Sequence, residues 1–148
     1  MSKINVYTTK QLKAAPIVDT SCLIDPLIPA TGIVFLHAKF GSGKTVLSIE
    51  EAIAVASGTP LFGMPTQKGR VALIEVDMPE TVFRKRFQSR IALLPDDIEI
   101  GWSFFLPFNC LASNFALTDE GKELKKIQTG LNPNLVIVDT LRKNLSWR

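Results

Sequence analysis

The amino-acid sequence predicts an α/β domain built on a mostly parallel sheet. Three short apolar runs, at residues 33–37, 71–76 and 135–139, have the length and composition of buried strands. Segments rich in helix-forming residues separate these runs along the chain. Strands that alternate with helices are typical of a parallel sheet with helices packed against it.

The first 31 residues contain three prolines and show little periodicity, which predicts an irregular arm over residues 1–31 and a core domain over residues 32–148. The first core strand is expected at residues 33–37, where apolar, β-branched and aromatic residues follow one another. A helix is expected at residues 46–57, because alanine, valine, leucine and isoleucine dominate it and Gly58 follows as a stop signal.

The alternation continues in the second half of the chain. After a loop rich in glycine and proline, the second strand occupies residues 71–76, and Pro79 then opens a helix. Residues 98–108 are rich in aromatic side chains and are expected to include a short strand. Thr118 is a suitable N-cap for a further helix, which ends before the third core strand.

Composition limits the class of protein. Hydrophobic residues make up 46% and charged residues 21% of the 148 residues, which is typical of a single globular domain. The longest apolar runs are strand-sized and no secretory signal is visible, so we expect a soluble cytoplasmic protein without membrane contact. Cys22 and Cys110 match no metal spacing and are expected as free thiols. The net charge of +3 permits contact with nucleic acid but does not argue for it.

A glycine-rich octet lies between the first predicted strand and the helix after it. It matches the pattern A/G-x-x-x-x-G-K-[ST] of a phosphate-binding loop and consists of Ala38, Lys39, Phe40, Gly41, Ser42, Gly43, Lys44 and Thr45. The two glycines let backbone N–H groups curl toward a triphosphate, Lys44 supplies a cation, and Thr45 supplies a hydroxyl for Mg²⁺. A strand, a loop and a helix in this order point the helix N-terminus at a bound phosphate. The alternative interpretation of the octet is an ordinary turn between a strand and a helix.

Two acidic residues follow strands at the edge where this loop is expected. Asp139 ends the third strand after four apolar residues, and a carboxylate there can hold Mg²⁺ directly or through water; it could instead begin a turn. Asp77 ends the second strand and is a candidate to polarise an attacking water, or to cap the next helix. Glu75 lies on the same face but deeper in the strand.

Other polar and aromatic residues have ordinary structural explanations. His37, at a strand end, is expected to have no catalytic role. The basic residues at 84–86 form either a solvated helix face or a contact with nucleotide or a neighbouring subunit. The aromatic residues at 102–108 are expected in the core rather than stacked on bases.

Several stretches together resemble RecA-like ATPases of the plasmid and phage RepA replicative helicase type, within the AAA domain family. The resemblance spans about residues 15–145 and rests on the lead-in at 28–32, the Walker A octet at 38–45, the helix exit at 54–63, the second strand and its end at 68–79, and the Walker B ending at 139–142.

This resemblance implies a three-layer P-loop NTPase fold with a RecA-like, mostly parallel sheet. It implies ATP and Mg²⁺ as cofactors, with Thr45 and Asp139 at the metal, and a DNA-dependent helicase-type ATPase that forms a homo-oligomer, a hexamer in the intact parent. In such proteins the acid after the second strand is the general base for water; here Asp77 replaces the usual Glu. Arg86 matches an arginine that often lies beside the adenine.

The resemblance also implies strands beyond the Walker B strand, which carry a sensor residue, DNA-facing loops and an arginine finger. This sequence ends at Arg148, so we expect a core truncated after that strand, either a fragment of a longer protein or a truncated gene product. Two alternatives stay open. One is a P-loop kinase; the other is a non-hydrolysing, nucleotide-gated interaction module, which Asp77 in place of Glu would favour.

Overall fold

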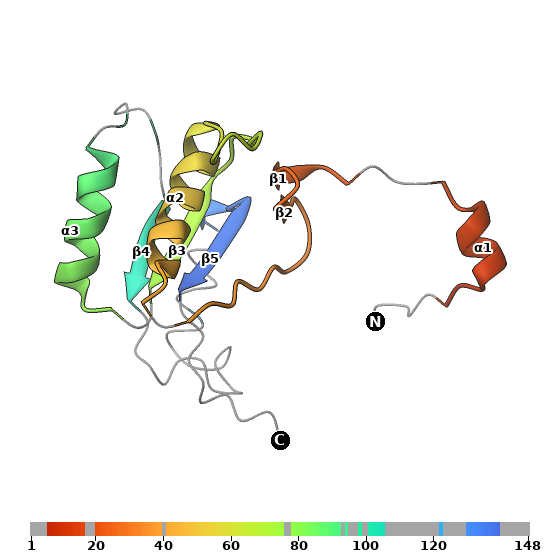
Figure 1. Cartoon of the computed structure of the whole chain (residues 1–148), viewed down its shortest axis with the longest axis horizontal. Coiled ribbons are helices and arrows are strands. Elements are labelled where there is room, and N and C mark those ends of the chain that lie inside the picture. The colour runs from red at the N-terminus through yellow and green to blue at the C-terminus, as the bar shows by residue number, and fades with distance from the viewer. Residues whose placement is uncertain are drawn as a thin grey trace, which may run out of the picture.

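The computed structural model describes residues 6–16, 20–39, 41–75, 78–92, 94, 98, 101–105, 122 and 130–139. Its helices and strands follow the chain in the order α1 (Thr9–Ala14), β1 (Cys22–Ile24), β2 (Ile28–Pro29), α2 (Lys44–Ser57), β3 (Val71–Glu75), α3 (Glu80–Ile91), β4 (Gly101–Phe105) and β5 (Leu135–Asp139) (Figure 1).

A parallel sheet of three strands organises the body of the molecule. Its order is β4-β3-β5, so the strand in the middle is the first of the three in sequence. β3 pairs in parallel with both neighbours, and its register with β5 runs from Val71 opposite Leu135 to Glu75 opposite Asp139. Parallel neighbours require crossover connections, which here include α3. The prediction of mixed helices and strands around a parallel sheet is therefore confirmed.

Helix α2 packs against β3 and β5 and supplies much of the core. Its buried apolar residues are alanine, isoleucine and valine, and they include Ile49, Ala52, Ile53 and Val55. It ends where the sequence predicts, at Gly58, whose left-handed backbone (φ 75°) is the usual glycine C-cap and whose N–H donates to the carbonyl of Ala54 at 2.8 Å.

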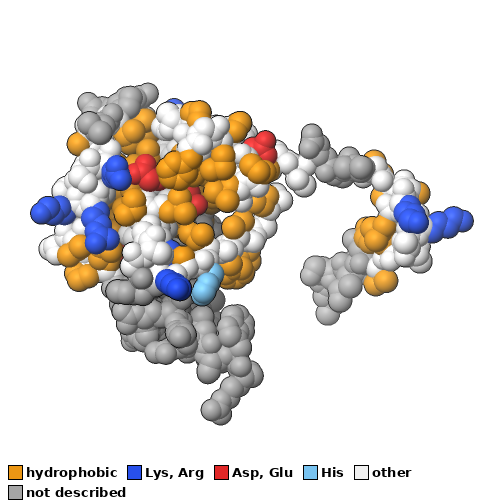
Figure 2. Space-filling view, viewed as in Figure 1, with side chains coloured by type: hydrophobic (Ala, Val, Ile, Leu, Met, Phe, Trp, Pro, Cys, Tyr) orange, Lys and Arg blue, Asp and Glu red, His pale blue; other side chains and the backbone are white. Residues whose placement is uncertain are grey.

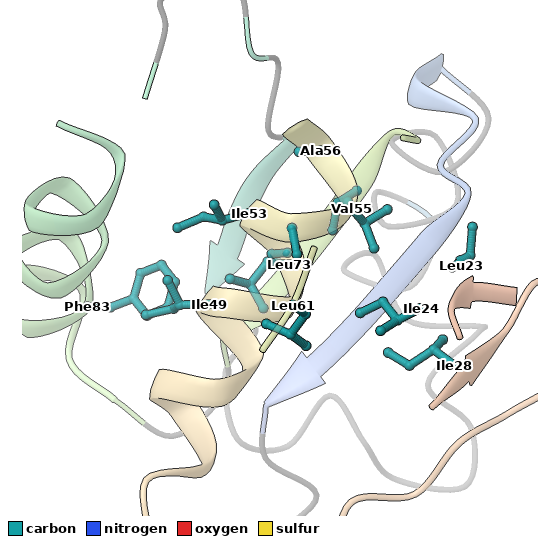
Figure 3. Close-up of a cluster of buried hydrophobic side chains, with 13 residues drawn as sticks. Leu23, Ile24, Ile28, Ile49, Ile53, Val55, Ala56, Leu61, Leu73 and Phe83 are labelled. Atoms are coloured by element: carbon teal, nitrogen blue, oxygen red, sulfur yellow. The ribbon is translucent and has the colours of Figure 1, made fainter. Parts of the chain in front are cut away.

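The core joins α2 and β3 to elements far away in the sequence (Figure 3). Phe83 of α3 is almost fully buried beside Ile49, and its ring stacks on Phe87 with centroids 5.7 Å apart. β1 and β2 contribute Ile24 and Ile28 from the other end of the cluster. The apolar contacts of this one cluster thus hold α2, α3 and the strand pair together.

The N-terminal 31 residues contain elements that the sequence did not predict. Helix α1 begins with a complete capping box between Thr8 and Gln11, yet none of its residues is buried and it stands apart from the body (Figure 1). The antiparallel pair β1–β2 places Leu23 and Ile24 in the core. These elements have six, three and two residues, which is too short for a visible periodicity.

The prediction of a buried strand at residues 33–37 is wrong. This segment is extended but pairs with no strand in the described part of the chain, and Ile33 and Phe35 are 82% and 75% exposed. Composition alone does not make a strand, because the backbone groups of a strand need a partner at hydrogen-bond distance. Among the described residues, β5 is therefore the last strand of the sheet at this end.

Some predictions fall outside the described residues, including the helix after Thr118 and the role of Cys110. β4 supplies the short strand expected within residues 98–108. Cys22 is half-buried, and its Sγ lies 3.8 Å from the carbonyl oxygen of Thr20, to which it donates. Within the described segments, the search for a helix long and apolar enough to cross a membrane found none.

Candidate phosphate-binding site

The loop before α2 has the backbone conformation that its glycines predict. Gly41 and Gly43 have φ angles of 76° and 91°, in the left-handed region that costs residues with a side chain about 1–2 kcal/mol. No heavy atom of the described residues lies within 4 Å of a Cβ built at either position, apart from the chain neighbours. Glycine is therefore required here by the backbone conformation and not by crowding.

The ammonium group of Lys44 lies across this loop. Its Nζ donates hydrogen bonds to the carbonyl oxygens of Ala38 and Lys39, at 2.8 and 2.9 Å. Ser42 closes the same turn, since its hydroxyl and its N–H donate to the Lys39 carbonyl at 2.7 and 3.2 Å. The loop thus encloses a cation that could transfer its hydrogen bonds to a phosphate. Phe40 lies outside the described residues.

Helix α2 begins at Lys44, directly after the loop. Its N-cap is Gly43, which offers no side chain to the first N–H groups, and its first turn holds no acidic residue. Unsatisfied N–H groups and the positive end of the helix dipole favour an anion at this position. Thr45 lies in the same first turn, so its hydroxyl is next to the point where phosphate would bind.

Two carboxylates lie at the ends of neighbouring strands. Asp139 ends β5, Glu75 ends β3, and the parallel register sets them side by side; both are buried. The Oε1 atom of Glu75 accepts a hydrogen bond from the N–H of Met78 at 2.9 Å, so this side chain holds the residue that lies two positions before α3. Asp77 lies outside the described residues.

A third buried carboxyl, Glu51, was not predicted from the sequence. It lies on α2 on the same side as Ser48 and Lys44, three and seven residues after them. Burial raises the pKa of Glu51, and the negative charge of Asp139 raises it further. The sequence offered one signal for this buried carboxyl, namely that Glu51 stands among the apolar residues of a helix predicted to pack on the core. Even so, the described residues contain no group of three ligands suited to a metal.

One open cavity of about 2260 Å³ connects these groups. It is lined by the loop, by the carboxylates and by the near side of α3, and its walls include Lys44, Thr45, Glu51, Glu75, Arg86 and Asp139. Figure 2 shows basic side chains on the side of the molecule where α3 lies. Arg90 ties α3 to α2 through a 3.0 Å ion pair with Glu50, while Arg84 pairs with Glu80 on α3 itself.

The structure thus brings Lys44, Thr45, Asp139 and Arg86 to one cavity, although they come from three different parts of the sequence. Ala38, Lys39, Gly41 and Gly43 line it as well. His37 is exposed at its rim, where no functional role was predicted for it.

Comparisons with curated proteins and with solved structures gave no match. A protein-family model described as an AAA domain matches residues 3–146, which is nearly the whole chain and includes the N-terminal arm. The glycine loop, its lysine and the strand-end aspartate described above are what such a domain needs for nucleotide phosphates. The chain therefore belongs to the AAA domain family, whose members are nucleotide-binding domains of the P-loop ATPase type.

Proposed function

We propose that this chain binds ATP with Mg²⁺ and hydrolyses it, as a RecA-like domain of a helicase-type ATPase in DNA replication. The observation that carries the proposal is the position of the Lys44 ammonium inside a glycine loop, at the open N-terminus of α2 and in the same cavity as Asp139. A triphosphate needs a cation, converging N–H groups and a metal ligand within one site.

In this proposal the N–H groups of residues 41–45 and the Lys44 ammonium hold the phosphates. ATP phosphate oxygens would replace the carbonyls of Ala38 and Lys39 as acceptors for Lys44. The hydroxyl of Thr45 and the buried carboxylate of Asp139 are hard oxygen donors of the kind Mg²⁺ prefers, so they fit the ion. When bound, Mg²⁺ would neutralise charge on the phosphate oxygens.

Asp77 would orient or deprotonate the attacking water, and Arg86 would lie by the adenine; these two roles rest on the family resemblance. Arg86 is exposed and lines the cavity, which agrees with such a role. The three-layer fold, the DNA partner and a hexameric assembly also belong to the proposal through the resemblance alone. Asp77 is one methylene shorter than glutamate, which favours slow turnover, or in the extreme a module that binds ATP without hydrolysis.

Binding of a fluorescent ATP analogue in the presence of Mg²⁺ tests the site. Lys44→Ala should weaken binding roughly ten- to a hundredfold, about 1.5–3 kcal/mol, because a charged hydrogen-bond donor to phosphate is lost. Lys68→Ala is the matched control, since Lys68 is exposed and does not line the cavity, so its loss should change binding little. Equal affinity of Lys44→Ala and the wild type would contradict the proposal.

Phosphate release separates hydrolysis from binding alone. With single-stranded DNA present, a hydrolase releases inorganic phosphate at a rate that Asp77→Asn lowers by two orders of magnitude or more, as expected for loss of a general base, roughly 10²–10⁴-fold. If the chain binds ATP tightly but releases no phosphate, the result supports the alternative of a non-hydrolysing, nucleotide-gated interaction module.

A further inference from the structure

Helix α3 carries the net charge of the chain. Four of the 17 basic residues and one of the 14 acidic residues lie on it, so its net charge of +3 equals that of all 148 residues. The rest of the chain has 13 residues of each sign, which cancel. Figure 2 shows Lys and Arg side chains on the side of the molecule where α3 lies. The net positive charge therefore belongs to one helix.

Three consecutive basic residues form the solvent side of α3. Phe83 is buried in the core, and Lys85 lies about 200° further around the helix, so it points almost directly away from the core. Arg84 and Arg86 flank Lys85, and all three residues are exposed. The acidic residue of α3, Glu80, lies at its N-terminal end. We call the surface formed by residues 84–86 the basic face of α3.

The ion pairs of α3 leave its positive charge available to a ligand. Arg84 pairs with Glu80, and the Nε of Arg90 lies 3.0 Å from a carboxylate oxygen of Glu50. Both arginine side chains stay more than half exposed, and a guanidinium has five N–H donors, so each keeps donors for a second anion. No carboxylate of the described residues pairs with the other two basic side chains of α3. Like charges on neighbouring positions repel one another, and a bound anion would relieve this repulsion.

The chemistry of α3 fits a chain of phosphates better than a protein or a membrane. Protein interfaces need a core of apolar and aromatic side chains, and helices on membranes need an exposed apolar face. Of the large apolar side chains of α3, Val82 is exposed, whereas Phe83, Phe87 and Ile91 pack in the core. Arginine and lysine bind the phosphates of nucleic acids mainly through charge, without an apolar contact.

We propose that the basic face of α3 binds the phosphate backbone of single-stranded DNA, and that this binding requires no nucleotide. The inference rests on the proposed function for the kind of nucleic acid. Arg86 and Arg90 line the cavity, whereas Arg84 and Lys85 do not. DNA bound along the basic face would therefore lie beside the cavity without filling it. Contacts to phosphates alone carry no preference for a base sequence.

Fluorescence anisotropy of a labelled single-stranded oligonucleotide tests the site, with the full chain at low salt and without nucleotide. The double variant Arg84→Gln/Lys85→Gln removes two charges that lie outside the cavity. If each residue contacts one phosphate, the variant should bind at least about tenfold more weakly than the wild type at low salt. Its plot of log affinity against log salt concentration should also be shallower by about 1.4, since each contact to a single strand contributes about 0.7.

The matched control is Lys10→Gln/Lys13→Gln, which removes the same charge from another exposed helix, α1, and should bind DNA like the wild type. All four positions are exposed, so both double variants should fold, as circular dichroism would check. Equal weakening in the two variants would show that DNA responds only to net charge. Unchanged binding by Arg84→Gln/Lys85→Gln would show that DNA binds elsewhere, and either result overturns the inference. Polyglutamate that displaces the oligonucleotide at an equal concentration of charges would indicate an acidic protein as the partner and would overturn it as well.

Titration of the same chains with the fluorescent ATP analogue separates this inference from the proposed function. Because Arg84 and Lys85 do not line the cavity, Arg84→Gln/Lys85→Gln should keep the wild-type affinity for ATP while it loses affinity for DNA. A wild-type chain that binds ATP but no oligonucleotide overturns this inference and leaves nucleotide binding intact. A wild-type chain that binds no ATP overturns the proposed function, whatever the result with DNA.

Discussion

Two charged side chains in the cavity, Lys44 and Glu51, differ in how well their surroundings stabilise their charge. The ammonium of Lys44 has two carbonyl acceptors, both of which a phosphate can replace. Glu51 is a carboxyl taken out of water on the apolar side of α2 and held near the carboxylate of Asp139. A ligand can therefore engage Lys44 at little cost, whereas ionisation of Glu51 opposes folding.

Glu51 should make stability depend on pH. Its pKa is raised in the folded state, first by burial and then by the charge of Asp139, so the folded chain holds this proton more tightly than the unfolded chain. The resulting stabilisation is complete below the ordinary pKa of glutamate and is lost as pH rises through the folded pKa. Glu51→Gln keeps the size without the charge, so it should be more stable than wild type near neutral pH.

Urea unfolding without Mg²⁺ measures this effect. The advantage of Glu51→Gln over the wild type should shrink toward about pH 4, where the carboxyl is protonated in both states. The control variant is Glu80→Gln, which removes an exposed carboxylate that pairs with Arg84 in place of a buried one. A Glu51→Gln chain that is no more stable than wild type at any pH would contradict the prediction.

Phe83 should be one of the most sensitive apolar positions. Its side chain is 1% exposed and stacks on Phe87, so Phe83→Ala should lower the free energy of unfolding by about 3–5 kcal/mol. Phe62 is 75% exposed, and Phe62→Ala should change it by no more than about 0.5 kcal/mol. Urea titration followed by circular dichroism compares the two, and similar losses in both would show that the core does not depend on α3 as described.

At the scale of elements, Gly58 determines how α2 ends. Its φ of 75° suits glycine, and a Cβ there would lie 3.0 Å from the Cβ of Lys68. Gly58→Ala should therefore destabilise the fold by about 1–3 kcal/mol, since strain and crowding add. Gly130→Ala is the control, because a Cβ at Gly130 meets no described atom within 4 Å and its φ is ordinary. Thermal unfolding of the two variants checks this, and a neutral Gly58→Ala would contradict the assigned cap.

The sequence predicted those elements whose signals are local. α2, β3, α3 and β5 each have a long apolar run or a clear start or stop residue, and each occurs within a few residues of its predicted bounds. α1, β1 and β2 were missed because so few residues show no period. The predicted strand at 33–37 failed for another reason: pairing is a property of two segments, and composition reports on only one of them.

In the candidate site, too, the residues with a local sequence signal were predicted and those that depend on distant segments were missed. The glycine loop, Lys44 and Thr45 are contiguous, so their pattern identified them, and the place of Asp139 by this loop followed from the parallel sheet. Arg86 was expected near the nucleotide only from the family resemblance. Glu51 was missed because glutamate is common on helices, and only its position relative to β5 makes it a buried carboxyl. Asp77 and Phe40 stay predictions from the sequence alone.

For the molecule as a whole, the exposed apolar surface is concentrated on particular segments. Beyond residues 33–36 and β5, the N-terminal arm exposes Val6, Tyr7 and Leu12, and no residue of α1 is buried. A helix of six residues gains little stability from its own hydrogen bonds, so this part of the chain depends on contacts that the body does not give it. The body itself rests on one modest core, and its global stability should therefore respond strongly to any ligand that binds the folded state.

Ligand-dependent melting of the whole chain measures that response. A ligand that binds only the folded state at a hundred times its dissociation constant adds about 2.7 kcal/mol, which for a domain of this size is roughly 5–10 °C in Tm. Mg·ATP should produce such a shift in the wild type, and EDTA should remove part of it, because Thr45 and Asp139 then lose the ion that they are proposed to share. In Lys44→Ala, measured at the same ATP concentration, the shift should fall by about half or more, since a site that is ten- to a hundredfold weaker adds only about 1.4 to 0.4 kcal/mol. A shift of equal size in both chains would mean that ATP stabilises the fold from some place other than the glycine loop, and the assignment of this cavity as the nucleotide site would then be wrong.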